Sequence, residues 1–355
     1  MTFATKLQLR QVSKFFGELR AVGNVDLEVQ QGEFFSIVGP SGSGKTTLLR
    51  ILAGFEKLTT GQILADGRDI TGDPPQRRNM AMVFQNYALF PHMTVFENVA
   101  FGLEAQHLPK SDIQRRVDRV LALVQLNHKV NEPVPHLSGG EQQRAAVARA
   151  LVVEPSVLLM DEPLSNLDVT LRVETREQLR LLQQRIKITT VYVTHDQSEA
   201  LALSDRMGVM NEGKLVQVGT PQEIYNSPQC LFVATFLGNA NTIRGTALQR
   251  SDRCVDVVIH QDVKICVPHE GDVREGQRVI VAVKPEHVKI VPASATGSLK
   301  AEIISIQFLG VFTEYLLKSS ELIIRVLQTG ADKSIRIGTR VSLEVDGPKC
   351  SVFTE

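Results

Sequence analysis

The chain has 355 residues, of which 43% are hydrophobic and 22% charged, and its 39 basic and 39 acidic side chains give no formal net charge. This length suggests two or three domains, and the composition excludes a disordered chain. A net charge of zero also excludes a polybasic protein that holds nucleic acid by charge alone. No window reaches roughly 18 uninterrupted apolar residues and residues 1–20 lack an apolar segment, so neither a membrane span nor a secretory leader is predicted.

The first two-thirds of the chain alternates strand-like segments with helical periods. Strands are predicted at residues 7–12, 25–29, 33–38, 62–65, 157–160 and 190–193, and helices at residues 46–53, 111–124 and 169–187. Asp66 and Gly67 form the dipeptide that is typical of a hairpin turn. Alternating strands and helices favour a mostly parallel sheet with helices on its faces.

The character of the chain changes near Gly238. Residues 231–237 are predicted to form a last helix, which Gly238 and Asn239 can end. Short strands are then predicted at residues 254–259, 263–267, 278–283, 301–308, 315–318, 322–327 and 340–345. Turn residues separate these strands at intervals of roughly 8–15 residues, which indicates a small β-barrel or sandwich. We therefore expect a first domain over residues 1–238 and a second over residues 239–355.

Four cysteines, Cys230, Cys254, Cys266 and Cys350, lie in the last third of the chain. None forms a CxxC pair or stands at zinc-site spacing with a histidine. We expect them to be reduced thiols in a cytosolic protein.

A phosphate-binding loop is predicted directly after the third strand. Residues 39–46 read GPSGSGKT and match GxxxxGK[ST] between a predicted strand and a predicted helix. Its glycines let backbone N–H groups face phosphate oxygens, and the start of the helix adds a partial positive charge. Lys45 is expected to reach the β- and γ-phosphates, and the Thr46 hydroxyl to bind Mg²⁺. The predicted phosphate site comprises Gly39, Pro40, Ser41, Gly42, Ser43, Gly44, Lys45, Thr46 and Thr47.

Two acidic residues end another buried strand, in the sequence VLLMDE at residues 157–162. Ligands of open α/β sheets bind beside the carboxyl ends of the strands. Asp161 is therefore a candidate Mg²⁺ ligand, and Glu162 a candidate general base that polarises the attacking water.

Further motifs distinguish this chain among phosphate-loop proteins. The sequence LSGGEQQR at residues 137–144 opens a helix, and such a small-residue start is a second surface that can bind phosphate. With it, the sequence resembles the ATP-binding subunit of ABC transporters. The other family motifs follow in order: Gln85 in VFQNYALFPHMTV resembles the Q-loop, Asp168 in SNLD the D-loop, and His195 in VYVTHD the H-loop. Phe16 in SKFFG falls where the family places an aromatic ring under adenine.

The resemblance implies a fold and a shared site. The fold would be an α/β P-loop ABC cassette with a helical subdomain at about residues 86–150, followed by a small all-β OB-like (TOBE) domain. Two copies would face each other head to tail, with ATP between the phosphate loop of one and Ser138, Gly139 and Gly140 of the other. Gln85 would sense Mg²⁺ and the attacking water, and His195 would contact the γ-phosphate. ATP and Mg²⁺ are the expected cofactors.

The resemblance also implies partners. IVAVKPEHV at residues 280–288 and FVATFLGNAN at residues 232–241 resemble importer ATPases, and GEFFSIVGPSG looks most like the spermidine/putrescine branch. The chain would work with two membrane permease subunits at the cytoplasmic face of the inner membrane, as a peripheral subunit, and indirectly with a periplasmic or surface solute-binding protein. No nucleic-acid partner is expected. One alternative is a soluble ABC protein that acts in DNA repair or translation. Another is a P-loop kinase or GTPase, and the LSGGEQQR motif argues against that alternative.

Overall fold

The computed structural model describes residues 5–251, 254–268, 273–293, 298–330, 332 and 334–355. Residues 1–20 are the segment for which no secretory leader is predicted, and the first four of them lie outside the described residues. The chain forms two compact units, Met1–Pro221 and Gln222–Glu355. The sequence places the junction later, at about Asn239. The difference arises because helix α8 (Leu231–Gly238) packs on strand β14 (Arg278–Val283) of the second unit.

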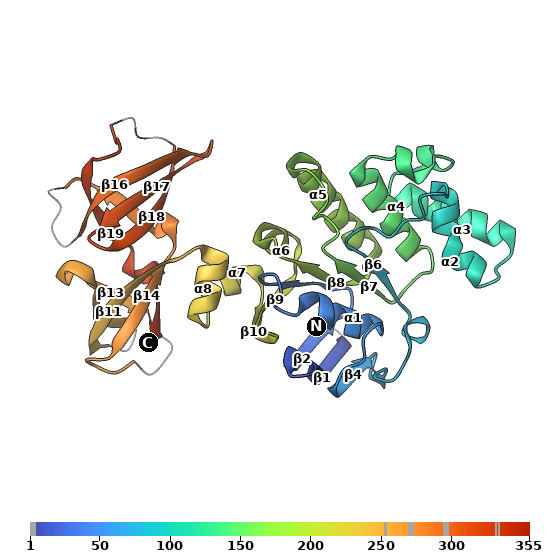
Figure 1. Cartoon of the computed structure of the whole chain (residues 1–355), viewed down its shortest axis with the longest axis horizontal. Helices are drawn as coiled ribbons and strands as arrows, with labels where there is room; N and C mark the ends of the chain where they lie inside the picture. Colours follow the sequence, from blue (N-terminus) through green and yellow to red (C-terminus); the bar gives the residue numbers. More distant parts are fainter. Residues whose placement is uncertain (1–4, 252–253, 269–272, 294–297, 331, 333) are drawn as a thin grey trace. The chain divides into compact units, whose positions relative to one another are not determined.

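A six-stranded sheet lies at the centre of the first unit, with strand order β10-β9-β3-β8-β7-β6 (Figure 1). Its strands are β3 (Phe34–Val38), β6 (Met80–Val83), β7 (Val157–Asp161), β8 (Thr189–Thr194), β9 (Arg206–Asn211) and β10 (Lys214–Gly219). All neighbouring strands are parallel except β10, which pairs antiparallel with β9. The mostly parallel sheet that the sequence predicts is therefore confirmed.

The central strands of this sheet are buried on both faces. Every residue of β3, β7 and β8 is buried. Successive side chains point to opposite faces of a strand. Phe34 and Met160 accordingly belong to a core shared with the long helices, whereas Phe35, Ile37 and Leu159 belong to a second core with helix α1 (Lys45–Ala53). Both faces are thus covered, as is usual for parallel sheets.

A second, antiparallel sheet packs into that second core. Its order is β2-β1-β4-β5, with β1 at Thr5–Phe16, β2 at Leu19–Gln30, β4 at Thr60–Ala65 and β5 at Arg68–Asp69. The predicted hairpin turn is confirmed, since Asp66 and Gly67 have positive φ angles between β4 and β5.

Helices follow the strands in the expected order. Helices α2 (Val95–Ala105), α3 (Lys110–Leu123) and α4 (Gly139–Leu151) lie between β6 and β7 in the chain, and α5 (Val169–Ile186) and α6 (Gln197–Leu203) flank β8. The apolar stripe of α3 is buried as its spacing predicts, through Ile113, Val117, Val120 and Leu121. Helix α4 packs against α2, α3 and α5. Within the described ranges no helix is long and apolar enough to cross a membrane.

In the second unit, two five-stranded antiparallel sheets follow helices α7 (Pro221–Asn226) and α8 along the chain. One sheet has the order β13-β12-β11-β14-β20 and the other β15-β19-β16-β17-β18. The strands not yet given are β11 (Asn241–Arg250), β12 (Cys254–Val258), β13 (Lys264–Pro268), β15 (Val288–Val291), β16 (Leu299–Phe308), β17 (Phe312–Ser319), β18 (Leu322–Thr329), β19 (Arg340–Val345) and β20 (Ser351–Thr354). Both sheets contribute to one core, which includes Val257, Val281 and Leu317. The predicted β-rich domain is confirmed, and β11, β15 and β20 are additions to the predicted strands.

The expectation of four reduced cysteines is wrong for two of them. Cys254 and Cys266 form a disulfide, with their Cα atoms 5.8 Å apart, while Cys230 and Cys350 are free. In the β12–β13 ladder Cys254 faces Pro268 and Asp256 faces Cys266, so the two sulfurs stand diagonally on the same face of the hairpin. The sequence shows no CxxC spacing because the pairing of strands, and not proximity in the chain, brings these cysteines together.

Candidate active site

The predicted phosphate loop connects β3 to α1 and depends on glycines at close approaches. Gly42 and Gly44 have φ angles of 77° and 100°, in the left-handed region that favours glycine. A Cβ atom on Gly39 would lie 2.1 Å from the carbonyl oxygen of Met210. The loop therefore passes tightly over β9 and opens directly into the first turn of α1, whose free N–H groups suit an anion.

Lys45 is the first residue of α1 and is only 4% exposed. Its Nζ atom donates hydrogen bonds to the carbonyl oxygens of Gly39 and Pro40, both at 2.9 Å. Burial lowers the pKa of Lys45, and the charges of Glu162 and Asp161 oppose that shift. Among the described residues no carboxylate contacts Lys45 Nζ directly. A buried cation that neutral carbonyls hold in this way is suited to pairing with an entering phosphate.

Asp161 lies at the carboxyl end of β7, opposite the start of α1. Its Oδ1 atom accepts a hydrogen bond from the Thr46 hydroxyl at 2.9 Å. Burial raises the pKa of Asp161, and the bond from Thr46 acts in the opposite direction. Thr46, Asp161 and Gln85 line one cavity of about 350 Å³ together with Asn166. The structure thus brings the three residues predicted for Mg²⁺ to one place.

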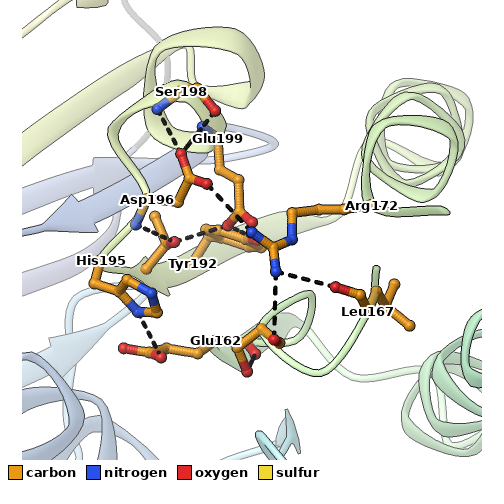
Figure 2. A network of polar contacts seen from close by, with 10 residues as sticks. Glu162, Leu167, Arg172, Tyr192, His195, Asp196, Ser198 and Glu199 are labelled. Carbon is orange, nitrogen blue, oxygen red and sulfur yellow. Dashed lines mark hydrogen bonds and ion pairs between the residues drawn. The ribbon is translucent and has the colours of Figure 1, made fainter. Parts of the chain in front are cut away.

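Glu162 and His195 meet at the ends of the neighbouring parallel strands β7 and β8 (Figure 2). His195 Nδ1 lies 2.8 Å from Glu162 Oε2. Glu162 has a φ angle of 46°, and its backbone N–H donates to the carbonyl of Val193, so the strand pairing holds this carboxylate in a left-handed turn. Non-glycine residues in that region are uncommon and cluster at functional sites. These two predicted catalytic residues are in direct contact.

A guanidinium behind this pair was not among the predicted site residues. Arg172, on α5, donates from Nη2 to the carbonyl oxygens of Leu167 at 3.0 Å and Ser165 at 3.4 Å (Figure 2). Its Nη1 atom lies 3.6 Å from Asp196 Oδ2. Arg172 therefore links the SNLD segment after Glu162 to the residue that follows His195.

The buried carboxylate of Glu199 supports the strand end that carries His195. Glu199 is 3% exposed, and its Oε2 atom accepts hydrogen bonds from Tyr192 and Thr194, both at 2.7 Å. Burial raises the pKa of Glu199. Asp196 caps α6 by accepting from the backbone N–H groups of Ser198 and Glu199. The strand end that carries His195 is thus held on both sides by side-chain hydrogen bonds.

Predicted nucleotide contacts in three segments of the chain do not join this cluster. Ser138 caps α4 in a reciprocal pair with Glu141, and no residue of the 138–140 segment hydrogen bonds to the described phosphate loop. Asp168 accepts from the backbone of Leu171 as the cap of α5. Phe16 is 48% exposed, with Lys14 Nζ 4.7 Å from its ring centre. Within one chain Ser138, Asp168 and Phe16 are exposed, whereas Gly139 is half-buried and Gly140 is buried.

Comparison with known proteins agrees with this geometry. Residues 22–165 match the ABC transporter family, and residues 281–353 match the TOBE domain. The chain is 45% identical over 320 residues to the spermidine/putrescine import ATP-binding protein PotA of Thermobifida fusca, which covers 88% of this chain and 83% of that protein. The chain belongs to the ABC transporter ATP-binding family.

Another relative and a solved structure are also similar to this ABC ATPase. It is 41% identical over 354 residues to the Fe(3+) ions import ATP-binding protein FbpC of Fusobacterium nucleatum, which covers 99% of this chain and 94% of that protein. The solved structure of cbiO1 from Clostridium perfringens, part of the ABC transporter complex cbiONQ, matches with a TM-score of 0.59 at 30% identity, over 64% of this chain and 92% of that one. The predicted P-loop ABC cassette followed by a β-rich TOBE domain is therefore confirmed, as is its assignment as an ATPase.

The ABC ATPase contains supporting residues that its sequence did not single out. These residues act through backbone or buried contacts. Arg172 and Glu199 lie outside the predicted motifs, and Asn166 lies within SNLD without having been a predicted site residue. Asn166 Nδ2 donates to the backbone carbonyl of Gln85 at 2.8 Å. Their positions in the sequence are a signal that could have found them. Arg172, Glu199 and Asn166 each lie within five residues of a predicted motif residue, in segments that hold strand ends in place.

Proposed function

We propose that this protein hydrolyses ATP to energise the import of a small solute through a separate membrane permease. The observation that carries the proposal is the convergence of Lys45, Asp161, Glu162 and His195 at the carboxyl ends of adjacent strands. Each of these residues has the chemistry that phosphoryl transfer from ATP requires.

In this proposal the phosphates of ATP bind the N–H groups of the loop formed by residues 39–47. Lys45 exchanges its two carbonyl partners for phosphate oxygens, an exchange that its burial favours. Glu162 accepts a hydrogen bond from water and draws its proton away as the water oxygen attacks the γ-phosphorus. The bond to the β-phosphate oxygen breaks, and ADP leaves with that electron pair. His195, held by Glu162 through Nδ1, offers its other ring nitrogen to the γ-phosphate.

Thr46, Asp161 and Gln85 form a suitable set of oxygen donors for Mg²⁺. Hydroxyl, carboxylate and amide oxygens are ligands for this hard cation, and the first two already lie 2.9 Å apart. Mg²⁺ supplies neutralisation of phosphate charge when bound. Thr46 and Asp161 would hold it, and Gln85 would report its presence to the segment before α2.

We further propose that two copies complete each nucleotide site. Ser138, Gly139 and Gly140, at the start of α4, form no described hydrogen bond to the phosphate loop of the same chain, so a second chain facing head to tail would supply them. Asp168 and Phe16, both exposed, would contribute to the dimer contact and to the adenine side. Nucleotide would close this dimer and hydrolysis would open it.

The names of the relatives support an importer and not a soluble ABC protein. Relatives named for spermidine/putrescine and for Fe(3+) ions both align over most of this chain, so we propose a polyamine or another small cationic solute as cargo. Two permease subunits would hold the ATPase at the cytoplasmic membrane face as a peripheral subunit, and a solute-binding protein would deliver the cargo. The TOBE domain would contribute to dimerisation or regulation.

Mixing two inactive variants tests the shared site. Lys45→Ala breaks the phosphate loop, and Ser138→Arg breaks the start of α4. In a head-to-tail mixed dimer, one site takes both defects and the other is intact. In a Glu162→Gln background, the mixture should trap one nucleotide per dimer although neither parent does. No trapping, despite subunit exchange shown by mass spectrometry, would contradict the composite site.

Reconstitution tests the transport function. The ATPase is co-purified with its permease and placed in lipid vesicles, and hydrolysis is measured with solute-binding protein loaded with spermidine, putrescine or ferric ion. We expect one solute to stimulate hydrolysis and to accumulate in the vesicle interior that corresponds to the cytoplasm. Hydrolysis without a permease partner or any stimulating solute would favour the soluble alternative.

A further inference from the structure

Two cysteines and an aspartate share the outer face of the β12–β13 hairpin in the second unit. Cys266 and Asp256 are exposed, and Cys254 is half-buried. The two sulfurs and a carboxylate oxygen of Asp256 all lie within 4.8 Å of one another. Among the residues that the structure describes, no other group of three or more histidine, cysteine, aspartate and glutamate side chains is gathered in this way.

The hairpin holds this arrangement independently of the disulfide. Five residue pairs join β12 to β13, and they place Asp256 directly opposite Cys266, with Cys254 on the diagonal. The other face of the hairpin is anchored in the core of the second unit through Val255, Val257, Ile265 and Val267. Opening the disulfide therefore leaves both sulfurs beside the same carboxylate.

The disulfide is accessible to reductants, because Cys266 is exposed. Exposed disulfides are the ones that thiols reduce most readily. A dithiol reductant would supply two electrons and two protons, so that the S–S bond breaks, two thiols form and the reductant becomes a disulfide. The reduced hairpin then presents two thiols and one carboxylate at one place.

The donor atoms indicate which ion fits this place. Thiolates favour Zn²⁺, whereas Mg²⁺ and Ca²⁺ prefer oxygen ligands alone. Two sulfurs bound to one tetrahedral Zn²⁺ lie about 3.8 Å apart. The Cα atoms of Cys254 and Cys266 are 5.8 Å apart, so rotation about the Cα–Cβ bonds is enough to give that spacing. Asp256 adds an oxygen, which is also a usual zinc ligand.

We propose that the reduced β12–β13 hairpin binds one Zn²⁺ through Cys254, Cys266 and Asp256. The ion displaces the two thiol protons to solvent, and water takes the fourth position. Ser251 Oγ, which lies 3.5 Å from the sulfur of Cys254, can donate a hydrogen bond to the resulting thiolate. The disulfide form has no thiolate to offer, so the oxidation state of this pair decides whether the ion binds. The residues of the proposed nucleotide site all belong to the first unit, so this site does not depend on the transport proposal.

Cd²⁺ and Zn²⁺ are the probes, with the full-length protein in the absence of nucleotide. The protein is reduced with a phosphine under nitrogen and titrated with Cd²⁺, whose bonds to thiolates give an ultraviolet charge-transfer band. Binding of Zn²⁺ is measured by competition with a chromophoric chelator. We expect one ion per reduced chain with release of the thiol protons, and no charge-transfer band from this pair in the oxidised protein.

Two variants separate the roles of the sulfurs and of the carboxylate. Cys254→Ser should abolish tight binding, whereas the double variant Cys230→Ser and Cys350→Ser should bind as the wild type does. Asp256→Asn keeps both thiols and should weaken Zn²⁺ binding at least about tenfold, because even partners outside the ligand set contribute about 10–100-fold. Asp262→Asn is its matched control, since Asp262 is an exposed carboxylate between the same two strands.

The opposite results overturn the proposal. It is wrong if the reduced protein, folded by circular dichroism, binds neither ion, or if Cys254→Ser binds as the wild type does. It is also wrong if Asp256→Asn binds Zn²⁺ as tightly as Asp262→Asn, because the carboxylate is then not a ligand. If reduction alone unfolds the second unit, the strand ladder does not hold the three groups together, and the proposal fails at that step.

Discussion

Replacing Arg172 should separate nucleotide binding from hydrolysis. The guanidinium bonds two backbone carbonyls of the SNLD segment and lies beside Asp196, and its side chain is 30% exposed. Hydrogen bonds from a charged donor contribute about 1.5–3 kcal/mol when well enclosed, and partial exposure reduces this, so we expect Arg172→Met to lose about 2 kcal/mol of unfolding free energy. For a unit of this size the melting temperature should fall by about 4–8 °C.

The effect on turnover should be larger than the effect on binding. Without Arg172, the segment between Glu162 and Asp168 loses its tie to the strand end that carries His195. We expect kcat for ATP to fall about tenfold, equivalent to about 1.4 kcal/mol of transition-state stabilisation, with KM nearly unchanged. Arg172→Lys keeps the charge but cannot bridge both carbonyls and Asp196, so it should recover little.

Arg176→Met is the matched control, because Arg176 lies on the same helix and has no described hydrogen bond or ion pair. Thermal unfolding followed by circular dichroism and a coupled assay of ADP release give the two readouts. The positioning role is refuted if Arg172→Met unfolds and hydrolyses ATP as the Arg176→Met control does. It is also refuted if KM rises while kcat stays constant, since that pattern indicates a role in binding.

Three further predictions concern the base, the buried carboxylate and the boundary. Glu162→Gln should bind ATP but hydrolyse it about 10²–10⁴-fold more slowly and accumulate as an ATP-bound dimer on gel filtration, and near wild-type turnover would exclude Glu162 as the base. Because burial raises the folded-state pKa of Glu199, its protonation stabilises the fold at low pH, and this contribution is lost as pH rises from 4.5 through the raised pKa. The unfolding free energy of wild type minus that of Glu199→Gln should therefore decrease over that window in urea titrations, and a constant difference would show that Glu199 does not titrate there. A fragment of residues 1–221 should fold and bind ATP. A fragment of residues 1–238 should also expose the apolar helix α8 and therefore bind more of a hydrophobic dye. Equal dye binding by the two fragments would place α8 with the first unit.

Much of the first unit could be predicted because its signals are local. The strand before the phosphate loop is apolar at all but one position, the loop needs glycine at fixed places, and helix α3 shows its buried stripe in its spacing. Such features depend on residues a few positions apart. The ends of β3, β7 and β8 could therefore be expected to share one edge of the sheet.

The parts that could not be predicted depend on pairing between distant segments. Strand β11 contains Gly245 and several polar residues, and it forms because β12 and β14 pair on either side of it. Gly245 is required where Val257 crosses, since a Cβ there would lie 2.6 Å from that side chain. The disulfide and the contact of Arg172 with Asp196 have the same origin. The local sequence of a segment does not indicate which strand or loop will lie opposite it in the fold.

The helical segment enters and leaves the sheet at adjacent strands. Residues 84–156, which include α2, α3 and α4, connect β6 to β7, and these two strands are paired in parallel. An insertion with both ends at one sheet edge can change its outer surface in evolution while its buried side and the strands beneath it are retained. If the proposed permease contacts this outer surface, selection can alter which permease is recognised without rebuilding the hydrolytic machinery.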